Sequence, residues 1–324
     1  MSTPAKTTQQ IFPNGLINPI VMGSIDKLHR QFIDALPFQH LIIDDFFDPQ
    51  FVQSLAASFP AFDDAKASDE SGKLGQKCVH EAVKALGEDY CRLDALVQNE
   101  EFLNVINNIT GIDELIYDPL YYGGGTHENR GGQDLDPHID FNYHPVTNHH
   151  RRLNLILFLN EEWRDDWGGL LELYADPDKE GRPTKTITPL LNRLVMFVTT
   201  EHSWHGFRRI NASADSSRKS FALYYYTMDR PVAETAPRHS TVYVERHLPS
   251  DILAGEVLTA AQLNEVQRLL HRRDQHIKRL YSDIEGLMSE LDIHTQSWTM
   301  RQARRAVNLV AKCRKLLAFD SRMK

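Results

Sequence analysis

The pattern of apolar and polar positions divides the chain into a mixed opening part, a strand-rich middle and a helical end. A short apolar run, FQHLIIDDFF, predicts a strand from Phe38, and the Asp48-Pro49 pair after it is typical of a helix cap and first helical position. Residues 78–108 carry apolar side chains at helical spacing, so we expect helices there. Residues 1–30 show no sustained periodicity, and we expect an N-terminal arm, laid on the surface or loose.

Between residues 115 and 229 the pattern changes to short apolar or alternating runs separated by Gly, Pro, Asn and Asp. The runs are ELIYDPLYY, RRLNLILFLN, GGLLELYADP, TKTITPLLNRLVMFVTT and RKSFALYYYT. Several short strands with turn residues between them are typical of a β-sandwich or barrel. The Gly168-Gly169 pair at the start of one strand and the aromatic run Tyr224-Tyr225-Tyr226 favour a jelly roll, within an α+β fold overall.

The end of the chain has helical patterning. Apolar residues three and four apart form a heptad seam that Arg273 interrupts: Leu263, Val266, Leu270, Ile277, Leu280, Ile284, Leu287 and Leu291. We expect a second, basic helix over 297–318. The seam fits a coiled-coil homodimer, a docked partner or packing on the chain's own domain, and the pattern leaves these open.

These patterns predict three regions: the arm over 1–30, a domain with the jelly-roll core over 31–245, and a helical C-terminal region over 255–324, for which a coiled coil is one of the open alternatives. The basic residues of the last region suit an anionic membrane surface, RNA, an acidic partner or simply a solvated helix face. Of these, the solvated face is our expectation.

The composition, with 41% hydrophobic and 25% charged residues among 324, is that of a globular protein. A net charge of -8 argues against a protein that works by wrapping nucleic acid, so no nucleic-acid partner is expected. Three scattered cysteines, Cys78, Cys91 and Cys313, favour reduced thiols in a cytoplasmic protein. The sequence shows neither a signal peptide nor an apolar stretch of the roughly 18 residues that a membrane span needs.

A possible metal site begins with His138 and Asp140. On a strand, residues two apart point to the same face, so both side chains could reach one ion. The pair alone is weak evidence, because about one such spacing is expected by chance in a chain of this size.

Two further histidines and an arginine strengthen this hypothesis. His202 and His205 follow the apolar run LVMFVTT, and their spacing leaves open which of them would bind. Two histidines and one carboxylate on one face of iron(II) leave positions open for a chelating 2-oxo acid and dioxygen. Arg218, later on a strand, could hold the far carboxylate of such an acid with paired hydrogen bonds, and parity directs Lys219 to the opposite face.

Five segments in this order resemble the core of the prolyl-4-hydroxylase-like branch of the iron(II)- and 2-oxoglutarate-dependent oxygenases: His138-x-Asp140, RRLNLILFLNEEW, WGGLLELY, His205-Gly206 and RKSFALYYYT. FQHLIIDDFFDPQFVQSLAASFP resembles the usual entry to that domain, and the resemblance covers roughly residues 36–228. It implies a double-stranded β-helix preceded by helices, with the C-terminal helical extension outside it. It also implies hydroxylation coupled to oxidation of 2-oxoglutarate to succinate and carbon dioxide. The implied cofactors are Fe(II), 2-oxoglutarate as cosubstrate and dioxygen, with ascorbate as an optional reductant.

The resemblance assigns roles one residue at a time. His138, Asp140 and His205 match the metal ligands, the His205-Gly206 pair deciding against His202, and Arg218 matches the residue that pairs with the cosubstrate. Further cosubstrate-binding candidates are Tyr121 or its neighbour Tyr122, Asn154 on the strand lining the pocket, and Ser220 on the face of Arg218. Phe158 departs from the family, in which a tyrosine is common here. His144, His149 and His150 are expected to form a polar loop, because further ligands would close the open site.

The leading hypothesis is therefore a hydroxylase of prolyl residues in a peptide or protein. A hydroxylase of a small metabolite, such as an amino acid or sugar, is the alternative within the same chemistry. A non-redox jelly-roll binding module with a helical oligomerisation tail, or a zinc hydrolase with the same ligands, would belong to other classes. The intact set of His138, Asp140, His205 and Arg218 favours the oxygenase.

Overall fold

A computed structural model describes residues 15–68, 74–213, 216–249 and 251–296. The chain forms two compact units, Met1–Ser250 and Asp251–Lys324, and each is described by itself. The division falls after the end of the predicted jelly-roll domain at residue 245 and before the start of the predicted helical region at residue 255.

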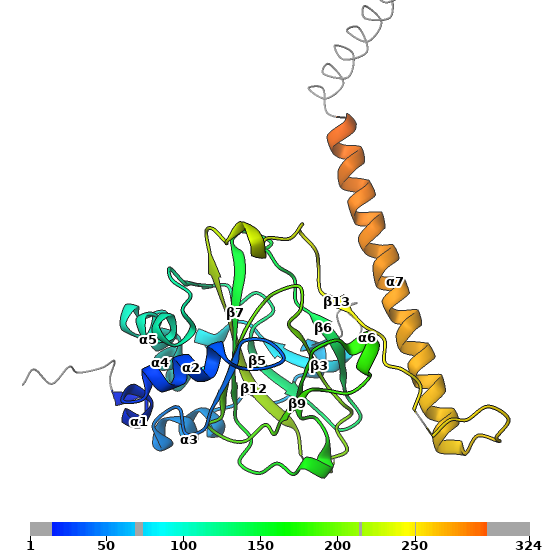
Figure 1. Cartoon of the computed structure of the whole chain (residues 1–324), viewed down its shortest axis with the longest axis horizontal. Coiled ribbons are helices and arrows are strands. Elements are labelled where there is room, and N and C mark those ends of the chain that lie inside the picture. The colour runs from blue at the N-terminus through cyan, green and yellow to red at the C-terminus, as the bar shows by residue number, and fades with distance from the viewer. Residues whose placement is uncertain (1–14, 69–73, 214–215, 250, 297–324) are drawn as a thin grey trace, which may run out of the picture. The chain divides into compact units, whose positions relative to one another are not determined.

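Two antiparallel sheets form the framework of the first unit (Figure 1). The larger has the order β1 (His40–Ile43), β10 (Leu194–Val198), β7 (His150–Phe158), β12 (Arg218–Thr227), β5 (Gly125–Asn129), β3 (Leu74–His80) and β2 (Ala67–Ser68), with β4 (Ile116–Tyr117) paired to β12. The smaller has the order β13 (Val242–Tyr243), β6 (Leu135–Ile139), β11 (Trp204–Phe207), β8 (Leu171–Tyr174) and β9 (Lys185–Ile187).

The chain alternates between these sheets. Strands β5, β7, β10 and β12 lie in the larger sheet, and β6, β8, β11 and β13, each of which follows one of them in the chain, lie in the smaller. Each of the five apolar runs predicted to contain strands does contain at least one. A mixed α/β fold with antiparallel sheets is therefore confirmed, and the alternation is what a jelly-roll core requires.

The two faces of the larger sheet bury different partners. Leu153, Leu155 and Leu157 of β7 belong to the main hydrophobic cluster, which contains buried residues of helices α2 to α5. Phe158, on the opposite face, packs with Leu171 of β8 in a second cluster between the sheets. One face is thus covered by helices, seen together at one side in Figure 1, and the other faces the smaller sheet.

The helices of this unit are short. Their bounds are α1 (Pro19–Met22), α2 (Ile25–Ile33), α3 (Pro49–Ala57), α4 (Glu88–Val97), α5 (Glu100–Thr110) and α6 (Pro177–Glu180), with 3-10 turns at Asp64–Lys66, Val83–Leu86, Asp165–Trp167 and Val232–Glu234. Asp48 caps α3 as predicted, because its carboxylate accepts from the backbone N–H groups of Gln50 and Phe51.

The helical prediction over 78–108 is wrong at its start and misses a break. Residues up to His80 belong to β3, and Asn99 separates α4 from α5. The Asn99 side chain accepts hydrogen bonds from the backbone N–H groups of Glu101 and Phe102, so it caps a new helix inside one continuous apolar pattern.

The N-terminal region also differs from the expected arm. Residues 1–14 lie outside the described part, but Leu16, Val21, Leu28 and Phe32 are buried in the main cluster. Helix α2 contributes only Leu28 and Phe32 to the buried side, and one such i,i+4 pair is too short to give sustained periodicity.

The second unit contains the long helix α7 (Ala260–Gln296). Its start is a capping box: Thr259 Oγ1 accepts from the Gln262 N–H, and the Gln262 side chain accepts from the Thr259 N–H. The second helix predicted over 297–318 lies outside the described residues. In the described part of the chain, no helix combines the length and the apolar character that a membrane crossing demands.

Candidate metal centre

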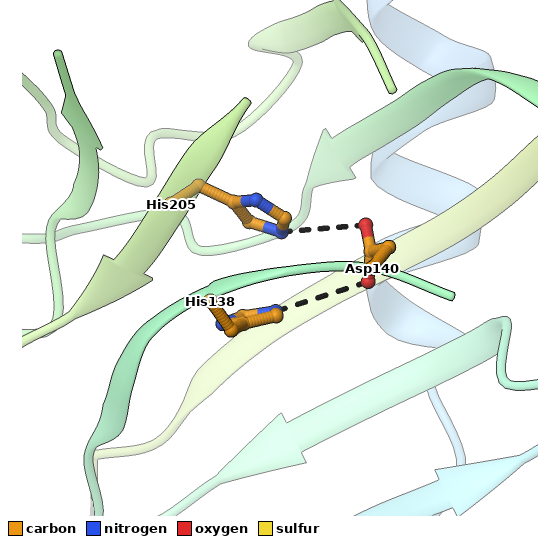
Figure 2. A group of neighbouring side chains, drawn as sticks. All are labelled: His138, Asp140 and His205. Carbon is orange, nitrogen blue, oxygen red and sulfur yellow. Dashed lines mark ion pairs between the residues drawn. The ribbon is translucent and has the colours of Figure 1, made fainter. Parts of the chain in front are cut away.

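His138, Asp140 and His205 meet at one point between strands of the smaller sheet. His205 of β11 is directly paired with His138 of β6, and Asp140 follows the end of β6 on the same face as His138. His138 Nε2 lies 3.8 Å from Asp140 Oδ1, and His205 Nε2 lies 3.6 Å from Asp140 Oδ2 (Figure 2). One ligand atom from each residue lies within 4.8 Å of the other two, so the three can hold a metal ion.

Both imidazoles are held with Nε2 toward the centre. His138 Nδ1 lies 2.9 Å from the Asp136 carbonyl oxygen, and His205 Nδ1 lies 3.0 Å from the Ser203 carbonyl oxygen. Since a carbonyl only accepts, each Nδ1 carries the proton and each Nε2 keeps its lone pair for a metal.

Burial sets the protonation states that metal binding needs. Burial lowers the pKa of His138 to about 3, and it also lowers the pKa of His205. Burial alone would raise the pKa of Asp140, but the Arg151 charge and both histidines outweigh it and hold the pKa below its ordinary value. At neutral pH the set is therefore two neutral imidazoles and one carboxylate, the donor set of non-haem iron(II) sites.

The packing of β11 against β6 explains why a glycine, Gly206, follows the second histidine. A Cβ on this residue would lie 2.7 Å from the carbonyl oxygen of Leu135 and 3.0 Å from the backbone of Asp136, on the neighbouring strand β6. Only glycine lets β11 approach β6 closely enough for His205 to face His138.

Asp140 is anchored by two residues of β7. Arg151 Nη2 lies 3.0 Å from Asp140 Oδ2, and Asn154 Nδ2 donates to the same oxygen at 2.6 Å. Arg151 also donates to Asn154 Oδ1 through Nε and Nη2, and its guanidinium lies 3.5 Å from the ring centre of Tyr224. The predicted Asn154 is thus at the metal carboxylate, and Arg151, 1% exposed, is a site residue that the sequence did not indicate.

Arg218 lies on the inner face of β12, beside the second histidine strand. Its guanidinium lies 4.6 Å from the ring centre of Phe207, two residues after His205, and 4.9 Å from that of Phe158. Nε donates to the Gly169 carbonyl at 2.7 Å. Phe158, where the resemblance leads us to expect a tyrosine, therefore contacts through its ring Arg218, the arginine predicted to bind the cosubstrate.

The positive charge of Arg218 has no acidic partner among the described residues. It is 5% exposed, takes part in none of the ion pairs found there, and burial lowers its pKa to about 9. A buried cation without a counterion favours binding of an anion, and a carboxylate matches the geometry of a guanidinium.

The glycines of the Gly168-Gly169 pair make room for this arrangement. Both have positive φ, of 66° and 67°. A Cβ on Gly168 would lie 2.1 Å from the Arg209 carbonyl oxygen, and one on Gly169 would lie 3.4 Å from Arg218 Cδ. The close backbone approach expected at this pair is confirmed.

Ser220 and His127 adjoin Arg218. Ser220 is buried and pairs in register with Phe158 on one side and His127 on the other. Burial, with the charges of Lys77 and Arg218, holds the pKa of His127 well below its ordinary value, so His127 is neutral. Sequence parity could have identified His127 only if β5 had been recognised as the neighbour of β12.

Tyr121 is not brought to the centre. Its hydroxyl donates to Asp94 Oδ1 at 3.0 Å, and its ring packs on Phe221 in the helix-covered cluster, on the other face of the larger sheet. Tyr122 is 43% exposed and its ring packs on Phe141 and His144. Neither tyrosine lies on the inner face with Arg218.

The other candidate histidines lie away from the three ligands. His202 is exposed in the turn before β11 and belongs to no possible metal group among the described residues. His144 is buried, and its Nδ1 accepts from the N–H groups of Val146 and Thr147, so it organises the loop after the metal strand. His150 is the first residue of β7, and its ring packs against Tyr143, which lies in that loop.

A C-terminal strand completes the surroundings of His138. In β13, Tyr243 pairs with His138, and its ring stacks on the imidazole with 5.3 Å between centres. Arg246 then forms an ion pair with buried Asp136 and donates to the carbonyls of Leu135 and Phe207. The alternating run Thr241 to Val244 was the only sequence signal for this strand.

The family comparison covers this site. Residues 124–226 match the model of the 2OG-Fe(II) oxygenase superfamily, a range that contains His138, Asp140, His205 and Arg218. The predicted resemblance to that superfamily is confirmed.

Individual relatives are more distant. Prolyl 3-hydroxylase OGFOD1 of Mus musculus is 25% identical over 236 residues, which is 68% of this chain and 38% of that protein. The chain thus spans well under half the length of this curated relative.

The solved structures to which this chain is similar include two that bear prolyl 4-hydroxylase names. The Phytophthora capsici structure is 17% identical, covers 94% of this chain and 97% of its own, and has a TM-score of 0.43. The Pseudomonas putida structure is 16% identical, covers 63% and 99%, and has a TM-score of 0.40.

Proposed function

We propose that this chain, which resembles the 2OG-Fe(II) oxygenase superfamily over residues 124–226, is an iron(II)- and 2-oxoglutarate-dependent dioxygenase that hydroxylates prolyl residues of a peptide or protein. One observation carries the proposal: a buried two-histidine, one-carboxylate set lies on strands adjoining a buried arginine that has no acidic partner among the described residues. The metal set alone would suit zinc as well, and the arginine favours the oxygenase because it can bind the carboxylate of a 2-oxo acid.

Different residues of the chain would bind the metal and the cosubstrate. His138 Nε2, His205 Nε2 and Asp140 would hold the metal, while Arg151 and Asn154 keep Asp140 Oδ2 occupied and so favour Oδ1 as the ligand atom. Arg218 would bind the distal carboxylate of 2-oxoglutarate. When bound, iron(II) and the cosubstrate supply the oxidising power that inserts one oxygen atom of dioxygen into a substrate C–H bond.

The surroundings of Arg218 suit an anion. The rings of Phe158 and Phe207 lie against its guanidinium and exclude water, which strengthens a charge-assisted hydrogen bond. Neutral His127 adds no competing charge, and Ser220 lies between it and Phe158.

The prolyl substrate is supported by the name of the mouse relative, a prolyl 3-hydroxylase, and a small-metabolite substrate is the alternative. We infer further that the two sheets form the double-stranded β-helix of the family and that the protein is cytoplasmic. Ascorbate is proposed as an optional reductant.

The test is an anaerobic titration of purified chain with iron(II) and then 2-oxoglutarate. We expect the visible charge-transfer absorption of a 2-oxo acid chelated to iron(II). After oxygen is admitted, succinate should form, and a proline-containing peptide library should show products heavier by one oxygen atom in mass spectrometry.

The outcomes separate the hypotheses. Absence of the absorption band and of succinate would overturn the oxygenase proposal, and zinc-dependent hydrolysis would then support the other class. A band and succinate, with oxygen incorporated only into amino acids or sugars, would retain the oxygenase and replace the substrate.

A further inference from the structure

Helix α7 exposes a long apolar seam. Seven large side chains on it are between 44% and 65% exposed: Leu263, Leu270, Ile277, Leu280, Ile284, Leu287 and Leu291. Helix α7 has 37 residues and is therefore about 55 Å long. A helix of this kind gains most of its stability by burying its apolar side against a partner.

The seam follows one heptad register without a skip. Positions a are Leu263, Leu270, Ile277, Ile284 and Leu291, and positions d are Val266, Arg273, Leu280, Leu287 and His294. Positions b, c and f, on the other side of the helix, carry only polar residues or glycine from Asn264 to Asp292, and Ile293 follows at c. The apolar side is thus a two-residue seam, the geometry of a coiled coil.

The residue types select the number and direction of the strands. The central layers alternate Ile277 and Ile284 at a with Leu280 and Leu287 at d. In parallel coiled coils, β-branched residues at a with leucine at d favour two strands. The exposed Tyr281 and Met288, at e, would widen the contact on one side of the seam.

Charge favours an identical partner. Arg273 interrupts the seam at d, where a parallel partner's e residue borders the position, and the e residue that follows it is Asp274. In a parallel pair in register, the two Arg273 residues face each other at d, and each also borders the Asp274 of the other copy, whose negative charge offsets their repulsion. Successive g and e' residues pair no like charges, since they join Gln262 with Gln267, Leu269 with Asp274, His276 with Tyr281, and Asp283 with Met288.

We propose that the exposed seam of α7 is a dimerisation surface whose occupant is the α7 helix of a second copy, parallel and in register. The catalytic proposal plays no part in this inference. The dimer interface needs only the described helix, and Arg273 with Asp274 fixes its register.

The first test is the mass of the full chain by light scattering and sedimentation equilibrium. We expect twice the mass of one chain at micromolar concentration. Leu280→Asp with Leu287→Asp places four carboxylates in the seam of the pair and should weaken dimerisation by ~100-fold or more. The matched control, Ser282→Asp with Ser289→Asp on the f positions, should stay dimeric.

The second test reads the direction of the helices. Leu287→Cys places two thiols opposite each other only in a parallel pair in register, so mild oxidation should link two copies through this residue. Ser289→Cys, on the outer face, should give no more linkage than the parent chain, whose own cysteines provide the baseline.

Three results would overturn the proposal. A monomeric parent chain would show that the seam does not pair with a second copy. A dimer that survives the Leu280→Asp, Leu287→Asp change would place the interface elsewhere. A dimer without the Leu287→Cys linkage would exclude the parallel register. An unchanged unfolding temperature in calorimetry of the aspartate variants will show that the first unit is folded.

Discussion

At the scale of single residues, substitutions of Asp140 and Arg218 are expected to impair the binding of different ligands. Asp140→Ala removes the only carboxylate among the three ligands and should abolish detectable iron(II) binding. Arg218→Met keeps the ligands but removes a buried cation, so 2-oxoglutarate affinity should fall about 30-fold or more, which is ~2 kcal/mol. Anaerobic calorimetry with each ligand distinguishes the two effects.

Lys219, the neighbour of Arg218, supplies the control for the Asp140→Ala and Arg218→Met variants. Lys219 points to the opposite face of β12, so Lys219→Met should leave both affinities unchanged. An equal loss of iron in the Asp140 and Arg218 variants would contradict the separate roles.

Arg151 offers a second residue-scale prediction. Arg151→Met keeps the apolar stem but removes the guanidinium that fixes Asp140 Oδ2 and lowers the pKa of Asp140, so the carboxylate is less well oriented and is protonated more readily. Iron(II) affinity should fall by about 10–100-fold, and the loss should be larger at lower pH because Asp140 then competes for a proton.

The adjacent arginine is the comparison for this variant. Arg152 pairs with Glu234 away from the centre, and Arg152→Met should bind iron(II) like the parent. If both variants bound iron(II) equally well at every pH, Arg151 would have no part in orienting Asp140.

The sequence could predict those residues whose role follows from strand parity and motif order. His138, Asp140 and His205 are brought together as predicted, and Arg218 shares the inner face with Ser220. Arg151 could not be recognised, because its partner Asp140 follows a strand of the other sheet and the placement of β6, β7 and β11 is a property of the whole fold.

Tyr121 is a residue whose position could not be predicted from the sequence. It lies outside the strands, in a turn, with φ of 50°, so no strand parity relates its direction to the inner face. The family resemblance indicated Tyr121 or Tyr122, and the backbone conformation at Tyr121 directs its ring to the helix-covered side.

At the scale of secondary-structure elements, the spacing of β6 and β11 depends on Gly206. Gly206→Ala adds a Cβ 2.7 Å from a backbone oxygen of β6, which cannot move without shifting His138. We expect about 1–3 kcal/mol less stability in chemical denaturation and weaker iron(II) binding. Gly286→Ala is the matched control.

That control has open space around its added methyl group. Gly286 lies inside α7, and an added Cβ would meet no atom within 4 Å, so alanine should stabilise the helix by up to about 1 kcal/mol. Gly206→Ala behaving like Gly286→Ala would mean that the strand spacing does not depend on this glycine.

Elements with a strong local signal were predictable, and their boundaries were not. The α3 cap and the long α7 helix follow directly from Asp48-Pro49 and from the heptads. The division between β3 and α4, and the burial of α2, depend on tertiary contacts that no local pattern contains.

At the scale of the whole molecule, the first unit should be independent of the second. All three hydrophobic clusters of the described residues draw their members from the first unit. A chain that ends before Asp251 should therefore keep the parent's unfolding temperature and iron(II) affinity while losing dimerisation. Calorimetry and sedimentation of both chains provide the measurement, and a fall in iron(II) affinity would show that the units are coupled.

The pairing of β13 with β6 has a consequence for synthesis. Until Val242 and Tyr243 have left the ribosome, the strand that carries His138 is a sheet edge, with unpaired N–H and C=O groups open to other chains. A nascent chain ending at residue 226, where the family match stops, would already contain every proposed ligand and would still lack this protecting strand. We therefore expect this late strand to protect the nascent chain against aggregation, besides stacking Tyr243 on His138 in the finished protein.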